Sequence, residues 1–336
     1  MTSRTPTGGS GPVLARLTHE RLGRNADMAN VSRRAGSRPP RLRRATVASA
    51  AGRWPCFRWY RIFTGSALTT VDESKPTMLF VAHPGHELRV HGWVHRARPA
   101  LSILTAGSRS TANSLRIAAS IAATSQDGLY LDALGGQILD KDFYRLVENG
   151  DVGPFHRWVD QLAGQLAGQG ARRLVVDGYQ LYSITHDIAH VMGRVAAVEA
   201  SKRLGWEIEV LHYPVVPFAL AGSVDFGEPA LAATLSDAEF QAKLAAIEIY
   251  PDIKAEFEEV VRIEGLDASR TETLFRPPQV EVLIRKPASK PAYEHFGELR
   301  VARGLYNAVL RWHHVEAILQ PLQDRRSGPG HRRAAP

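Results

Sequence analysis

The chain has 336 residues, of which 44% are hydrophobic, so it is long enough for one large domain or two small ones. It contains no run of about 18 consecutive apolar residues, so no transmembrane helix is expected. The single cysteine, Cys56, excludes an intrachain disulfide and a cysteine-based zinc site. Any metal ion must therefore be held by histidines and carboxylates.

The formal net charge of +8 is distributed unevenly along the chain. Residues 1–70 contain 13 Arg, no Lys and two acidic residues, which gives this segment a net charge of +11. The remaining residues contain 29 basic and 32 acidic side chains, a net charge of −3. The high isoelectric point thus belongs to the N-terminal segment, and we expect no nucleic-acid partner for the folded part.

Residues 1–75 lack hydrophobic periodicity and are rich in Arg, Ser, Gly and Pro, a composition typical of a disordered extension. Three interpretations stay open: an organelle-targeting peptide, a contact with a membrane surface, or a plain extension. Residues 53–61, where aromatic side chains alternate with cations, favour the membrane contact. The absence of a regular apolar face favours the plain extension, with the protein itself cytoplasmic. Residues 326–336 are also expected to be disordered.

From residue 76 onward, short apolar runs alternate with helical patterns. This alternation predicts an α/β core over residues 76–225, with a Rossmann-like parallel sheet flanked by helices. Residues 226–325 are expected to form a mostly helical region that packs on this core. The predicted strands are 78–82, 100–105, 173–176, 207–211 and 280–285, and the predicted helices are 114–124, 155–166, 186–200, 237–249, 254–263 and 301–319.

Three polar clusters follow predicted strands, at residues 83–87, 105–108 and 182–190. In open α/β sheets, ligands bind beyond the carboxyl ends of the strands, so the clusters are expected to meet there. His83 and His86 are three residues apart and share one face if the loop turns into a helix. His186 would complete a set of three ligands that leaves one position for water. Glu87, beside these ligands, would serve as a general base or orient a ligand.

Other interpretations of these histidines stay open at this point. The chain has 13 His, so a chance pair that is merely hydrogen-bonded in a loop is as plausible on spacing alone. His186 and His190 have the i, i+4 spacing of a metalloprotease helix, but Asp187 is short for the position that Glu normally occupies. A dinucleotide site is disfavoured, because no GxGxxG motif follows the first strand.

Residues 80–87, with the sequence FVAHPGHE, resemble the AHPDDE signature of the PIG-L/LmbE-like family of zinc-dependent N-acetylglucosaminyl deacetylases. The resemblance covers about residues 77–250 and includes four further segments, residues 104–108, 114–116, 185–190 and 236–243. It implies an LmbE-like fold and an N-acetylated amino sugar or glycoconjugate as substrate. It also implies Zn²⁺ or another divalent transition metal as cofactor. By position, the metal ligands would be His83, His86 and His186, and Arg116 and Ser108 would face the substrate.

The chain departs from the family pattern at three carboxylate positions, which hold Gly85, Ala119 and Thr185. Gly85 replaces the family's general base, a loss that typically costs about 10²–10⁴-fold in rate. One hypothesis is a deacetylase in which Glu87 or Asp187 replaces that base. The alternative is a metal- or sugar-binding protein that no longer hydrolyses its ligand. Homo-oligomers are compatible with either.

Overall fold

The computed structural model describes residues 75–107, 120, 134, 138–221 and 224–327. These residues belong to one compact unit, Thr64–Pro336. Residues 1–74 and 328–336 lie outside the described residues, so their predicted disorder stays a prediction, whereas Arg326 and Ser327, also predicted to be disordered, form the end of α10 (Trp312–Ser327). The helix predicted over residues 114–124 lies outside them too, apart from Ser120.

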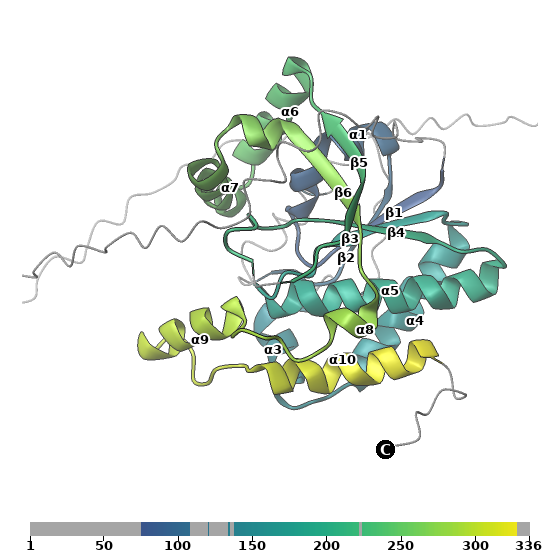
Figure 1. Ribbon diagram of the computed structural model, residues 1–336, viewed down its shortest axis with the longest axis vertical. Coiled ribbons are helices and arrows are strands. Elements are labelled where there is room, and N and C mark those ends of the chain that lie inside the picture. The colour runs from purple at the N-terminus through teal and green to yellow at the C-terminus, as the bar shows by residue number, and fades with distance from the viewer. Residues whose placement is uncertain (1–74, 108–119, 121–133, 135–137, 222–223, 328–336) are drawn as a thin grey trace, which may run out of the picture. The chain divides into compact units, whose positions relative to one another are not determined.

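The fold is built on a mixed six-stranded sheet with the strand order β2-β1-β3-β4-β6-β5 (Figure 1). The first four strands in this order are parallel, as predicted, whereas β6 is antiparallel to both β4 and β5. Strands β1 and β3 are buried over nearly their whole length, as their continuous apolar sequences indicate. The strands are β1 (Thr77–Val81), β2 (Ala100–Ile103), β3 (Arg173–Asp177), β4 (Glu209–Tyr213), β5 (Glu228–Thr234) and β6 (Thr271–Arg276).

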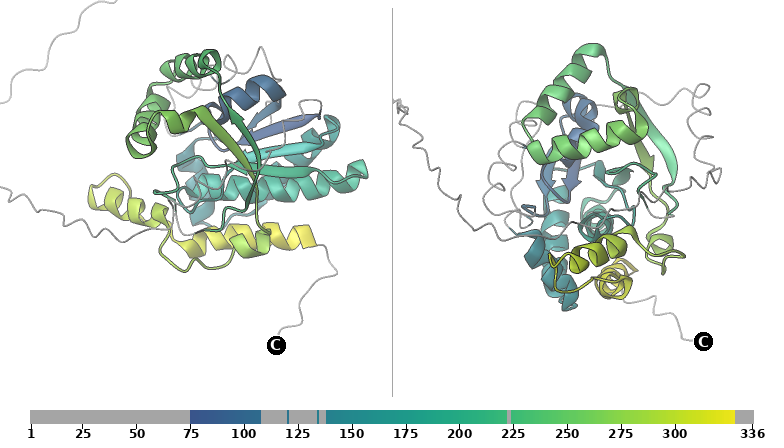
Figure 2. Two further views of the ribbon diagram at one scale, coloured as in Figure 1. Left: turned by 45° about the horizontal axis from the view of Figure 1, so that its top comes forward. Right: turned by 90° about the vertical axis from the view of Figure 1, so that its left-hand side faces the viewer.

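Helices cover both faces of the sheet (Figures 1 and 2). Met78 and Phe80 of β1 face a core formed with α3, α4, α5, α8 and α10, while Leu79 and Val81 face a second core formed with α1. Within the described residues, no helix has the length and apolar character needed to span a membrane. The helices are η3 (His86–Val90), α1 (His91–Ala97), α3 (Asp140–Glu148), α4 (Gly153–Gly168), α5 (Ile184–Leu204), α6 (Asp237–Glu248), α7 (Pro251–Glu264), η4 (Asp267–Arg270), α8 (Val280–Leu283), α9 (Ala292–Ala302) and α10 (Trp312–Ser327).

Two predictions for the C-terminal third are wrong. The strand predicted over residues 280–285 is the short helix α8, in which Val280 and Leu283, three residues apart, are buried and Val282 is exposed. The single helix predicted over residues 301–319 is divided, because α9 ends at Ala302 and α10 begins only at Trp312. Gly304, with φ of +69°, lies just after α9 and turns the chain away from the helical path.

Residues 226–325 are mostly helical, as expected, but they also supply β5 and β6 to the sheet. The antiparallel end of the sheet is therefore built from the region predicted only to pack on it. The division of the chain at residue 225 stays a prediction.

Candidate metal centre

The polar loop that follows β1 turns directly into the short helix η3, which begins at His86. Gly85 precedes η3 with φ of +101°, a conformation that residues with a Cβ rarely adopt. A Cβ at this position would lie only 2.6 Å from Cγ1 of Ile253, which closes the space beside Gly85. The tight turn brings the rings of His83 and His86 to a centroid distance of 5.2 Å.

His186, in the first turn of α5, completes a cluster of three imidazoles. Its ring centroid lies 5.2 Å from that of His83 and 4.6 Å from that of His86. All three side chains are buried. Burial and the neighbouring imidazoles hold the pKa of His186 well below its ordinary value, so this ring is neutral, the form that binds metals. The structure thus brings the three predicted ligands together.

A hydrogen bond to Thr105 orients the ring of His83. Its Nδ1 lies 2.7 Å from Oγ1 of Thr105. The Thr105 hydroxyl has one proton to donate and already lies near two acceptors, Oδ1 of Asp140 at 3.0 Å and the carbonyl of Ala82 at 3.1 Å. His83 Nδ1–H is therefore the donor to Thr105, which puts the lone pair of this imidazole on Nε2.

Asp177, the last residue of β3, orients His86 in the same way. This role of Asp177 was not predicted from the sequence. Its Oδ2 accepts hydrogen bonds from Nδ1 of His86 at 2.7 Å and from the amide of Ala82 at 2.9 Å. Its Oδ1 accepts one from the Tyr213 hydroxyl at 2.7 Å. Burial alone would raise the pKa of Asp177, but the electrostatic interaction and the hydrogen bond with His86 hold it well below its ordinary value. An ionised carboxylate behind an imidazole is the usual support of a metal-binding histidine.

The same geometry makes Asp177 an alternative ligand. Atoms of His86, Asp177 and His186 suitable for metal binding all lie within 4.8 Å of one another. Neither His83, whose ring centroid lies 5.2 Å from those of His86 and His186, nor His190, the second histidine of the i, i+4 pair, is part of this group. The metalloprotease-like spacing therefore does not form a metal site with His186 in the described part of the chain.

Glu87, one of the two proposed bases, is engaged in holding the loop. Its side chain is buried, and Oε2 accepts a hydrogen bond from the amide of Gly85 at 2.8 Å. Oε1 accepts hydrogen bonds from the hydroxyls of Ser120 at 2.5 Å and Tyr250 at 3.2 Å. Burial raises the pKa of Glu87, although the bonds from Ser120 and Gly85 act in the opposite direction. These contacts favour a structural role.

Asp187, the other proposed base, supports the loop between β3 and α5. Its Oδ1 accepts hydrogen bonds from the amides of Gln180 at 3.0 Å and Leu181 at 3.2 Å. Burial raises the pKa of Asp187 to about 8, so the carboxyl is mostly protonated at neutral pH and is a poor base there. Ser108 and Arg116 lie outside the described residues, and their roles toward substrate stay predictions.

Two further histidines lie buried beside this site. His190 of α5 donates from Nδ1 to the carbonyl of Asp177 at 2.9 Å, and His212 of β4 donates from Nε2 to the carbonyl of Phe226 at 2.8 Å. Their ring centroids are 5.1 Å apart. Both rings are completely buried, so protonating either would place a charge in the protein interior.

The burial of His212 predicts a loss of stability in acid. Burial lowers the pKa of His212 to about 3, whereas the unfolded chain takes up a proton below about pH 6.5. The free energy of unfolding therefore falls as the pH drops from 6.5 toward 3, by about 2 kcal/mol from His212 alone between pH 7 and pH 5. Urea denaturation at both pH values measures this change. His212→Gln should lose correspondingly less stability, while the exposed control His313→Gln should match the wild type. Equal losses in all three proteins would contradict the prediction.

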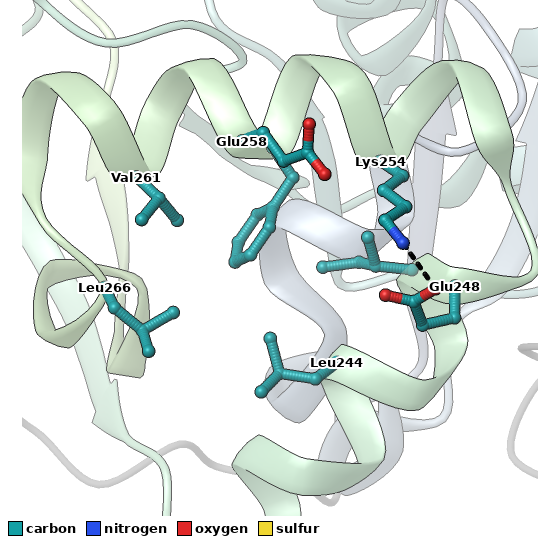
Figure 3. A pocket seen from close by; sticks show the side chains of 8 residues that line it. Leu244, Glu248, Lys254, Glu258, Val261 and Leu266 are labelled. Atoms are coloured by element: carbon teal, nitrogen blue, oxygen red, sulfur yellow. Dashed lines mark hydrogen bonds and ion pairs between the residues drawn. The ribbon is translucent and has the colours of Figure 1, made fainter.

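A surface groove of about 260 Å³ lies between α6 and α7 (Figure 3). An ion pair between Lys254 and Glu248, 2.8 Å apart, lies at its edge, and Leu244, Val261 and Leu266 form part of its apolar lining. None of the clustered histidines lines it. The groove is therefore separate from the metal centre.

No protein-family model and no curated protein matches the chain. Solved structures match about 60% of it. One is the A40926 pseudoaglycone deacetylase Dbv21, with 16% identity and a TM-score of 0.38 over 60% of this chain and 98% of that one. Another is the conserved protein TT1542 from Thermus thermophilus, with 17% identity and a TM-score of 0.39 over 61% and 95%. A third is the zinc inhibited form of teicoplanin deacetylase Orf2, with 14% identity and a TM-score of 0.35 over 60% and 99%. These values are too low to transfer an activity to this chain.

Proposed function

We propose that the protein binds one divalent transition metal ion, most simply Zn²⁺, through His83, His86 and His186. The observation that carries the proposal is the convergence of three buried imidazoles from the segments that follow β1 and β3. Two of them are oriented through Nδ1 by Thr105 and Asp177. Three imidazole nitrogen donors, two of them with supporting partners, fit a zinc site that keeps a position for water.

We further propose that this centre hydrolyses a linear amide, removing the acetyl group from an N-acetylated amino sugar or glycoconjugate. The resemblance of residues 80–87 to the deacetylase signature supports this reaction. When bound, the metal would supply a Lewis acid and a water of lowered pKa. The three imidazoles hold the centre, and Asp177 fixes the direction of His86. Without a well-placed base, turnover is expected to be about 10²–10⁴-fold below that of an enzyme that has one.

A second candidate is a metal- or sugar-binding protein without hydrolytic activity. Two observations favour it. The position beside Gly85, where the family carries its base, is closed by Ile253. The carboxyl groups of Glu87 and Asp187 are engaged with the backbone near the site. A metal-binding protein would share the proposed metal centre with the hydrolase and differ from it in turnover, whereas a sugar-binding protein would not require the metal.

Metal removal tests both candidates. Protein purified without a metal-chelating tag is expected to contain about one zinc ion per chain, measured by elemental analysis. Dialysis against a chelator should remove the ion, abolish acetate release from a panel of N-acetyl sugars and lower the melting temperature. At zinc 1,000-fold above its Kd, the bound ion contributes about 4 kcal/mol to stability. Adding zinc should restore all three properties.

The outcomes separate the two candidates. Zinc uptake with acetate release supports the hydrolase. Zinc uptake without acetate release from any sugar in the panel supports the binding protein. Apoprotein that takes up no zinc contradicts the hydrolase and the metal-binding protein, and leaves only a sugar-binding protein.

A further inference from the structure

The loop that carries the proposed metal ligands is tied to a distant part of the chain. The metal loop, residues 83–87, ends in Glu87, whose carboxylate bonds back to the amide of Gly85 between the two histidines. The same carboxylate accepts a hydrogen bond from the hydroxyl of Tyr250, which lies 163 positions further along the chain. Tyr250 connects helices α6 and α7, which together with it form the α6–α7 hairpin, residues 237–264. One buried carboxylate therefore joins the metal loop to this hairpin.

Apolar packing reinforces the same connection. Leu88 of η3 packs in a separate buried cluster with Ile247, Tyr250 and Ile253 of the hairpin. Ile253 also closes the space beside Gly85, where even a Cβ would collide with it. The hairpin therefore contacts the chain on both sides of His86, at Gly85 in the metal loop and at Leu88 in η3.

Ser120 adds a third attachment at the same carboxylate. Its hydroxyl donates to Oε1 of Glu87 at 2.5 Å, and the Gly85 amide lies 3.1 Å from the same hydroxyl. All of these groups are buried, so water does not compete for the hydrogen bonds. The backbone of Gly85 is thus held by two partners, Glu87 and Ser120.

We infer that Glu87 and Tyr250 are positioning residues. Their hydrogen bond fixes the metal loop against the α6–α7 hairpin and so holds His83 and His86 at the spacing that a metal ion requires. The inference rests on the proposed metal site and assigns Glu87 a role different from that of a base. Positioning partners of this kind typically change metal affinity by about 10–100-fold. Tyr250 acts through Glu87 and is not expected to contact metal or substrate.

The test uses metal alone and needs no substrate. Tyr250→Phe removes only the hydroxyl that donates to Glu87 and keeps the ring in its apolar cluster. We expect its zinc affinity, measured by competition with a chromophoric chelator, to fall about 10–100-fold. The visible spectrum of the cobalt-substituted protein should also change, because it reports the arrangement of the ligands. Glu87→Gln should shift both measurements in the same direction and further.

Tyr306→Phe is the matched control. It makes the same chemical change at an exposed hydroxyl, which accepts a hydrogen bond from Arg300. Its affinity and cobalt spectrum should equal those of the wild type. A purely structural role predicts a lower melting temperature for Tyr250→Phe with unchanged affinity and spectrum, and that result overturns the inference. Wild-type protein that binds no metal overturns both the inference and the proposed metal site. Binding without turnover contradicts only the hydrolase.

Discussion

His83→Ala is expected to reduce bound zinc from about one ion per chain to background and to abolish any acetate release. The variant removes one of the three proposed ligands and leaves the imidazoles of His86 and His186. Asp177 already accepts hydrogen bonds from His86, Ala82 and Tyr213, so we do not expect it to replace the lost ligand. His83 lies in the loop between β1 and η3, outside any helix or strand, and its side chain is not part of the apolar cores. The far-UV circular dichroism spectrum should therefore be unchanged. Elemental analysis and an acetate assay measure the other two effects.

Two further variants make this expectation specific. His313→Ala, at an exposed position on α10, makes the same chemical change far along the chain from the loop and should retain full zinc content. Asp177→Asn keeps all three imidazoles but replaces the charged acceptor of His86 Nδ1, so its zinc affinity should fall by about 10–100-fold without being lost. If His83→Ala retained wild-type zinc content, the metal centre would have to be placed elsewhere.

The convergence of the three histidines was predictable because it depends on topology. His83 and His186 each follow a parallel strand, and β1 pairs directly with β3. The carboxyl ends of such strands meet at one edge of the sheet, whatever the detailed packing. The continuous apolar sequences of β1 and β3 predict buried parallel strands for the same reason.

The groups that support these histidines depend on contacts that the sequence pattern does not reveal. Asp177 was visible as an acid at the end of a strand, but its bond to His86 depends on the register between β1 and β3. The role of Glu87 depends on Tyr250, which no local pattern places near the metal loop. Because Glu87 directly follows His86 in the sequence, it was predicted to serve as a base. In the structure its carboxylate instead accepts a hydrogen bond from the amide of Gly85 within the loop.

The antiparallel strands were missed for a different reason. Strand β5 has the sequence EPALAAT, in which Pro and Ala have low strand propensity. It lies at the edge of the sheet and pairs with one strand only. An edge strand tolerates a proline, which has no backbone N–H, because no second strand needs that hydrogen bond. Strand β6 contains Glu272, a buried acid that interrupts the apolar pattern. In both strands, tertiary contacts outweigh local preference.

The second prediction with a large expected effect concerns Glu272 and its partner Lys243. Lys243→Met is expected to lower the free energy of unfolding by about 3–5 kcal/mol, because it leaves the charge of Glu272 buried without its partner. Nζ of Lys243 lies 2.9 Å from Oε1 of Glu272, and both side chains are almost completely buried. Lys243 also donates to the carbonyls of Arg89 and Ser269, at 3.2 and 3.3 Å. Denaturation in urea, monitored by circular dichroism, measures the loss.

The chain provides a matched pair for comparison. Lys254 and Glu248 are 2.8 Å apart, almost the same separation, but both side chains are exposed at the edge of the groove (Figure 3). Lys254→Met should leave the denaturation midpoint unchanged, because water solvates the remaining carboxylate and exposed ion pairs contribute little to stability. Glu272, in contrast, also accepts hydrogen bonds from the amides of Gly92 and Trp93 at the start of α1, so it cannot leave the interior without disrupting that helix. Equal losses of stability in the two variants would show that burial does not determine the strength of this pair.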